Sequence, residues 1–251
     1  MRNPGVRSFK PLSAAVAFIF LTVALSFGGE VYSTGPAGPK WECGVTAGGC
    51  FPLGPFWDNI GHPGLSFNFS LGHRLGNSLF TFGLDAAYVI YGLRSRTEFL
   101  SGNIPVEVDV DTTNNIVQGL LYIKLQPRRG RVRPYVEALA GLNYLYTETS
   151  INGRDYPYEE ITSSTNFDDV ALTAGGGAGL AIRLGRGQDQ GGGPAKKSQV
   201  FLDIKVRYLA GARAKYLRED SIIPEDGGFT YLYMESRTDL ISSQIGISII
   251  F

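Results

Sequence analysis

The feature that most constrains this chain is a long stretch in which apolar and polar residues alternate one by one. Between residues 200 and 215, one set of alternate positions carries aliphatic, aromatic or small side chains, and the other includes Asp203, Lys205 and Arg207. A period of two indicates a β-strand whose two faces meet different environments. Sixteen alternating residues exceed the ~5–6 of a usual globular strand. They suit a strand that crosses a membrane, which needs ~9–11 residues plus protruding ends.

Seven other segments repeat this alternation, without sustained helical periodicity between them. They cover residues 41–49, 65–74, 80–90, 115–125, 136–146, 172–184 and 238–251. Short connections at residues 75–78 and 127–131 alternate with longer ones at 50–64, 96–111, 151–168 and 218–230. The composition of residues 185–198 indicates a flexible insertion. An even strand number with short turns at one end and long loops at the other is typical of bacterial membrane barrels. The sequence therefore predicts an all-β fold, an eight-stranded antiparallel up-and-down transmembrane β-barrel, with ten strands as the open alternative.

The two faces of these strands differ in charge. One face is almost free of charge, and the other carries Glu42, Arg74, Asp85, Lys124, Glu137, Arg183, Asp203, Lys205, Arg207, Arg213 and Lys215. A Lys or Arg on the lipid face costs ~2–4 kcal/mol at the bilayer midplane, so the charged face is expected to line the lumen. There, mixed signs can pair and plug the barrel. A soluble lipocalin-like barrel with the faces inverted is the alternative.

Aromatic residues are expected to form girdles at the two membrane interfaces. Those expected at the outer interface are Tyr88, Tyr144, Tyr146, Tyr208 and Tyr216, and those at the inner interface are Trp41, Phe80 and Phe251.

The N-terminal segment has the organisation of a secretory signal peptide. Arg2, Arg7 and Lys10 precede an uncharged apolar run over residues 12–27, and small residues around Ser26 and Gly28 offer cleavage sites. The run is short for a membrane anchor of ~20 residues, the alternative. We expect a signal peptide over residues 1–28, a short periplasmic lead over 29–40 and the barrel over 41–251.

The region from residue 41 to 251 resembles the small outer-membrane β-barrel proteins related to the OmpA transmembrane domain. The resemblance rests on residues 130–135 leading into 138–142, on 175–180, on the strand 203–209 and on the terminal Phe251. It implies an exported protein of the Gram-negative outer membrane, with the lipid bilayer as a partner. It also implies recognition of the last strand by the assembly machinery. Anchors, adhesins, small pores and enzymes share this fold, so it does not define an activity.

Several short motifs are candidates for chemical sites. Residues 191–198 resemble a phosphate-binding loop but have Lys196 where glycine is needed, and the glycines of 175–179 lie in a predicted strand. His62 and His73 are the two histidines, and a hydrolase would need one of them beside a serine and an acid. Other candidates are a divalent-cation site at Glu107, Asp109 and Asp111 and a disulfide between Cys43 and Cys50. We predict no catalytic, cofactor or metal site, and the disulfide stays open.

The charge balance also excludes one class of partner. Lys and Arg number 23 and Asp and Glu number 23, which is atypical of nucleic-acid binders. The sequence favours a structural or surface-interaction barrel without enzymatic activity. The rivals are a narrow porin for small solutes, an outer-membrane lipid-modifying enzyme and a soluble binding barrel. The external ligand is not specified by the sequence.

The predicted signal peptide can be tested by locating its cleavage site. We expect the mature protein to begin near residue 27 or 29, because the candidate cleavage sites end at Ser26 and Gly28. N-terminal sequencing of protein from the membrane fraction checks this, and an intact Met1 there would contradict it.

Overall fold

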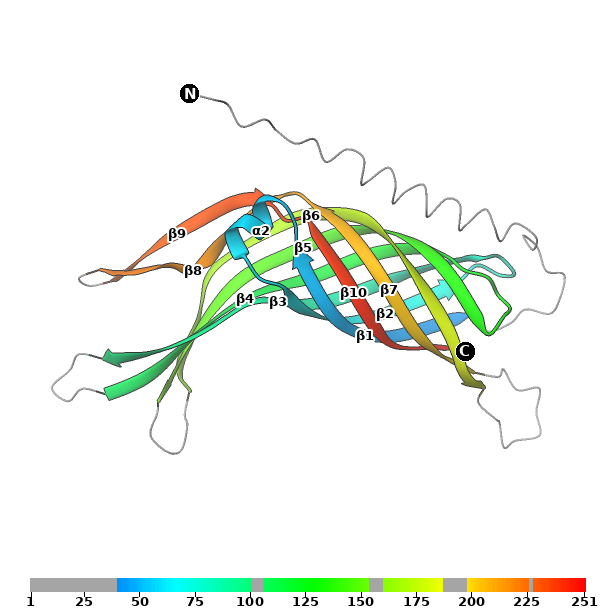
Figure 1. The fold of residues 1–251 in the computed structure, drawn as a ribbon, viewed down its shortest axis with the longest axis horizontal. Helices are drawn as coiled ribbons and strands as arrows, with labels where there is room; N and C mark the ends of the chain where they lie inside the picture. The colour runs from blue at the N-terminus through cyan, green and yellow to red at the C-terminus, as the bar shows by residue number, and fades with distance from the viewer. Residues whose placement is uncertain (1–39, 101–105, 154–159, 187–197, 226–227) are drawn as a thin grey trace, which may run out of the picture.

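The computed structural model describes residues 40–100, 106–153, 160–186, 198–225 and 228–251, so the expected signal peptide lies outside the described residues. Eight strands form a closed barrel in the order β1-β10-β7-β6-β5-β4-β3-β2 (Figure 1). Their bounds are β1 Trp41–Pro52, β2 Gly64–Arg74, β3 Phe80–Leu100, β4 Val106–Leu125, β5 Val132–Gly153, β6 Glu160–Arg186, β7 Gln199–Gly211 and β10 Leu240–Ile250. Every neighbouring pair in the barrel is antiparallel. The predicted eight-stranded antiparallel barrel is confirmed.

The barrel closes where the first strand meets the last. β1 pairs with β10 from Glu42 opposite Ile250 to Pro52 opposite Leu240, and β10 pairs on its other side with β7. The Phe251 N–H donates to the Trp41 carbonyl over 2.9 Å, which continues the pairing to the chain end. Within the closed barrel each strand therefore pairs on both sides, a condition that a sheet must meet inside a bilayer.

The two faces of the wall are inverted relative to a water-soluble barrel. Large apolar side chains lie outside, with Leu121 66 % and Leu172 69 % exposed, while polar and charged side chains are buried inside. Tyr88, Tyr144 and Tyr208 are exposed on the outer face, as are Trp41, Phe80 and Phe251 toward the other end. The predicted assignment of the faces is therefore confirmed for the barrel strands.

Short turns close one end, called here the short-turn end. Gly76 (φ 48°) lies in the turn between β2 and β3, and Gly130 (φ 112°) lies in the turn between β4 and β5. Both need the positive φ that glycine adopts without a steric penalty. β6 ends and β7 begins at this end, and residues 187–197 between them are outside the described residues.

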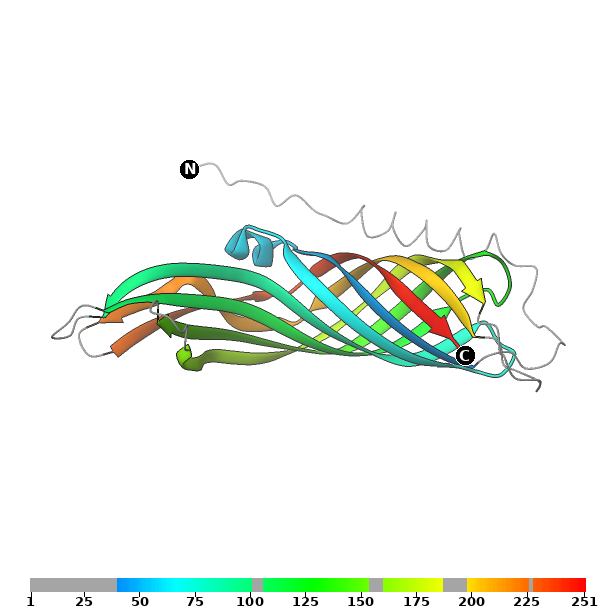
Figure 2. The ribbon, with the colours of Figure 1, turned by 90° about the horizontal axis from the view of Figure 1, so that it is seen from below.

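The opposite end is called the extended end, because β3 to β6 run on beyond the barrel (Figures 1 and 2). These four strands have 20 to 27 residues, against 11 to 13 in β1, β2, β7 and β10. A separate hairpin of β8 (Arg213–Glu225) and β9 (Gly228–Arg237) lies at the same end. The long loops predicted at 96–111, 151–168 and 218–230 are thus largely strand. One of these segments, residues 106–111, alternates valine with acidic residues and belongs to β4.

The expected loop at 50–64 contains a helix, α2 (Pro55–Ile60). Pro55 fits the first helical turn, and Gly61 ends the helix in the left-handed region with φ 78°. Within the described residues, no helix is long and apolar enough to cross a membrane.

The predicted strand over residues 200–215 is wrong at its outer end. β7 ends at Gly211, and β8 begins at Arg213 as part of the separate hairpin. Ala214 and Tyr216 are each 1 % exposed, whereas Arg213 and Lys215 face solvent. Arg213 and Lys215 are therefore not lumen residues, and Tyr216 is not part of the outer girdle. The chain leaves the barrel wall at Ala212, so the alternation continues but its two faces exchange environments.

Single substitutions at two neighbouring residues of β7 test which face of the wall contacts lipid and which lines the lumen. Ile204 is 40 % exposed on the outer wall and Lys205 is 4 % exposed inside. We expect Ile204→Lys to fold into vesicles far less well than Lys205→Ile, because a lipid-facing Lys costs ~2–4 kcal/mol near the midplane. The folded fraction is measured by the different gel mobility of unheated and heated protein. A lipid-phase thiol reagent that labels the Lys205→Cys variant but not the Ile204→Cys variant would contradict the assignment.

Candidate functional site

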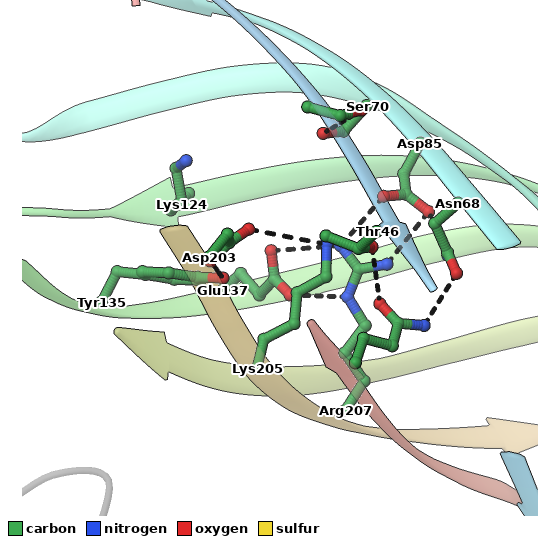
Figure 3. A network of polar contacts seen from close by, with 12 residues as sticks. Thr46, Asn68, Ser70, Asp85, Lys124, Tyr135, Glu137, Asp203, Lys205 and Arg207 are labelled. Carbon is green, nitrogen blue, oxygen red and sulfur yellow. Dashed lines mark hydrogen bonds and ion pairs between the residues drawn. The ribbon is translucent and has the colours of Figure 1, made fainter. Parts of the chain in front are cut away.

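The barrel interior holds an arginine that joins three strands. Arg207 on β7 lies between Asp85 on β3 and Glu137 on β5 (Figure 3). Its Nη2 and Nη1 donate to the two Asp85 oxygens over 2.9 and 3.0 Å, and its Nε donates to Glu137 Oε1 over 2.6 Å. Arg207 is 2 % exposed and Asp85 1 %. Paired, hydrogen-bonded geometry of this kind is what a desolvated charge requires.

Two further ion pairs lie beside this cluster. Lys124 pairs with Glu42 across the lumen, and Lys205 Nζ is 4.0 Å from an Asp203 oxygen. The Tyr135 hydroxyl donates to Asp203 Oδ1 over 2.6 Å. All four acids expected in the lumen, and three of the expected bases, are thus in ion pairs. Arg74 instead donates to Gln126 over 3.3 Å, and Arg183 is half-buried near the short-turn end.

Neutral side chains extend this network into a second polar layer. Gln244 donates to Asn68 over 2.8 Å, and Asn68 donates to Asp85 over 3.1 Å. Gln118 donates to Asn143 over 3.0 Å on the facing wall. Strand parity predicts that these amides face the interior, but the sequence carries no signal for which of them pair.

An apolar cluster lies at the extended end of the interior. Phe56 on α2 packs against Tyr91 on β3 and Tyr216 on β8, with ring centroids 5.5 and 5.0 Å apart. All three are at most 1 % exposed. We call these residues and those packed with them the mouth cluster, whose other buried members are Cys50, Val89, Ile116, Leu145, Ala171, Ala214 and Leu240. This cluster is not predicted by the sequence, because Phe56 lies in an expected loop and the alternation places Tyr216 on the outer face.

The interior near the short-turn end is also filled by large side chains. Tyr135, Phe201 and Ile250 pack together, and the Arg133 guanidinium lies 4.5 Å from the centre of the Phe201 ring. Arg133 also donates to the Gln199 side chain over 2.7 Å. The lumen therefore holds polar layers between apolar groups at its two ends.

Glycines on β6 make space for these large residues. A Cβ at Gly177 would lie 2.9 Å from both Arg207 Cγ and Glu137 Oε1, and one at Gly179 would lie 2.5 Å from the Tyr135 ring. The expectation that the glycines of 175–179 accommodate bulky lumen neighbours is confirmed at these two positions. Most of the loop-like motif at 191–198 lies outside the described residues.

The candidate chemical residues do not assemble into a site. His73 is outside the barrel, 4.7 Å from the Trp41 ring, whereas His62 precedes β2 at the other end of that strand. Cys43 is half-exposed and Cys50 is buried in the mouth cluster; both are free, so the disulfide left open by the sequence is not formed.

The candidate cation ligands Glu107, Asp109 and Asp111 belong to β4, in a stretch whose side chains are outside the described residues. Within the part of the chain that the structure describes, no group of three or more His, Cys, Asp or Glu side chains can hold a metal ion.

A closed antiparallel barrel with an apolar exterior and a charged, hydrogen-bonded interior defines a transmembrane β-barrel. No protein-family model and no curated protein matches the chain. Among solved structures, it is similar to Neisserial surface protein A, with 13 % identity, a TM-score of 0.44 and coverage of 84 % of this chain and 97 % of that one. It is also similar to Ail of Yersinia pestis, with 12 % identity, a TM-score of 0.32 and coverage of 84 % and 99 %. A third is the translocator domain of NalP from Neisseria meningitidis, with 12 % identity, a TM-score of 0.21 and coverage of 96 % of each chain.

Removal of the central arginine tests how far the interior pairs stabilise the barrel. We expect Arg207→Met to lower the free energy of unfolding by ~3–5 kcal/mol, because Asp85 and Glu137 remain buried without their cation. Arg213→Met is the control, since its pair with Glu235 is exposed and such pairs contribute ~0–1 kcal/mol. Urea unfolding in detergent micelles measures both. Equal losses in the two variants would show that the interior pairs contribute no more than surface pairs.

Proposed function

We propose that this protein is an integral outer-membrane barrel that anchors an exposed surface and does not conduct solutes through its lumen. The observation that carries the proposal is the filling of the interior. The mouth cluster lies at the extended end, the ion pairs of Arg207, Lys124 and Lys205 lie between, and Phe201 packs near the other end. Eight strands enclose an interior just wide enough for side chains to fill.

The orientation follows from the connections. Bacterial membrane barrels have short turns on the periplasmic side and longer segments outside the cell. The short-turn end is therefore assigned to the periplasm, and the extensions of β3 to β6, with the β8–β9 hairpin, to the exterior. The expected signal peptide over residues 1–28 agrees with export to this membrane.

The exposed part presents side chains suited to contact with other molecules. Tyr233 on β9 is 56 % exposed, stacks on Phe167 at 6.1 Å and carries the Lys215 ammonium 4.9 Å from its ring centre. Exposed aromatic and charged groups of this kind are common in recognition surfaces. This supports a surface-interaction role without identifying the ligand.

The closing strand supports a role in assembly. Phe251 is 44 % exposed and directly follows β10, the last barrel strand in the sequence, which pairs with β1. We propose that the assembly machinery recognises this strand. His73 lies against the Trp41 ring on the outer wall, which argues against a hydrolase centred on it, and we propose that the barrel has no enzymatic activity.

Conductance in planar bilayers tests the closed lumen. We expect no stable wide-pore conductance from the unmutated protein, and a leak from the triple variant Phe56→Ala, Tyr216→Ala, Arg207→Ala, which loses both the apolar and the ionic obstruction. Trp57→Ala is the control for α2, because Trp57 is 38 % exposed and lies outside the mouth cluster. Stable conductance of the unmutated protein at the level of a wide porin would contradict the proposal and favour a passage for solutes.

A further inference from the structure

Basic side chains dominate the short-turn end of the barrel. Among the described residues there, the acidic side chains are Glu42, Glu137 and Asp203, which are all buried and paired with interior cations. The basic side chains are Lys40, Arg74, Lys124, Arg128, Arg129, Arg131, Arg133 and Arg183. Among the residues that the structure describes, basic side chains therefore outnumber acidic ones at this end.

Some of these cations belong to the interior. Arg74, Lys124 and Arg133 are at most 6 % exposed and interact with Gln126, Glu42 and Gln199 respectively. The remaining five are exposed or half-buried, and we call them the basic rim: Lys40, Arg128, Arg129, Arg131 and Arg183. The rim therefore places five basic residues together at one edge of the barrel wall.

Backbone contacts hold several rim residues together. The Arg128 guanidinium donates to the Asn77 carbonyl over 3.3 Å, which links the β4–β5 turn to the β2–β3 turn. The Arg183 N–H donates to the Arg131 carbonyl over 2.7 Å, which links the same turn to β6. The rim arginines thus lie on the β4–β5 turn and on β6, and the contact with Asn77 ties that turn to the β2–β3 turn.

The rim lies at the edge of the apolar belt. Val132 follows Arg131 and is 51 % exposed, and Leu184 follows Arg183 and is 60 % exposed. In a membrane-embedded barrel these apolar side chains contact acyl chains, so the adjacent arginines lie at the level of the lipid headgroups. Arginine matches phosphate oxygens with two parallel hydrogen bonds and keeps its charge at any physiological pH.

We propose that the basic rim binds the phosphate groups of anionic phospholipids in the leaflet that adjoins the short-turn end. This inference rests on the proposed membrane location. The extended end has the opposite balance: its described side chains include Asp58, Glu148, Asp168, Asp169, Glu235 and Asp239 against Arg213, Lys215 and Arg237. Anionic lipid is therefore favoured at one end of the barrel, which aligns the protein with the headgroup charge of that leaflet.

A local fluorescence reporter tests the inference. The chain has two tryptophans, so Trp41→Phe, Trp57→Phe and Val132→Trp together place a single indole beside Arg131 on the lipid face. This parent is folded into phosphatidylcholine vesicles that contain brominated phosphatidylglycerol or brominated phosphatidylcholine at equal mole fraction. We expect stronger quenching by brominated phosphatidylglycerol, and a preference that weakens as salt is added.

Matched charge removals identify the source of the preference. Arg129→Gln with Arg131→Gln should lower the relative association constant for phosphatidylglycerol on the order of fivefold per arginine. Arg213→Gln with Arg237→Gln removes the same charge at the extended end and should leave that constant within about twofold, since charges farther away than a Debye length of roughly 10 Å are screened.

Each contrary result has a defined meaning. Equal quenching by the two lipids, or equal losses in the two double variants, would overturn the lipid assignment alone. Loss of the preference on adding inorganic phosphate at constant ionic strength would indicate a free-phosphate site and overturn it as well. Failure of the parent and the unmutated protein to insert into any vesicle would overturn the proposed function together with this inference.

Discussion

Hydrogen bonding between the first and last strands is the constraint on which the rest of this structure depends. In hydrocarbon, each unpaired backbone N–H or C=O costs several kcal/mol, so a sheet can cross a membrane only when it has no free edge. Pairing of β1 with β10 over their length removes that edge. Closure also separates the two faces completely, so every alternate residue must suit either lipid or a narrow interior.

Charge pairing and side-chain packing in the interior depend on each other. Arg207 satisfies Asp85 and Glu137 at once, and Gly177 leaves the space that its side chain and the Glu137 carboxylate occupy. Replacing that glycine by a larger residue would displace the central cation rather than fill a void. The small residues of β6 and the large charged residues of its neighbours therefore form one arrangement, in which neither works without the other.

Unequal strand lengths separate a membrane part from an exposed part. β3 to β6 continue past the barrel, while β7 ends at Gly211 and its chain turns into the β8–β9 hairpin (Figure 2). Phe56 and Tyr216 come from outside the barrel wall, yet they pack against Tyr91 in the mouth cluster. The exposed elements thus contribute to filling the interior that they cover, which couples the two parts energetically.

The sequence by itself determined the eight wall strands, the two faces of their barrel portions and most of the charged interior, but it wrongly assigned Arg213 and Lys215 to the lumen and Tyr216 to the outer face. These properties are local, because strand parity and the length of alternation are visible within ten or so neighbouring residues. Tertiary structure decided which charges pair. Arg207 and Asp85 are 122 residues apart and meet only because the register brings β3 and β7 to face each other across the lumen. It also decided the exchange of faces after Ala212, the packing of α2 into the mouth and the separation of Cys43 from Cys50. Alternation specifies that two faces differ, but which environment each face meets is set by where the completed barrel places the strand.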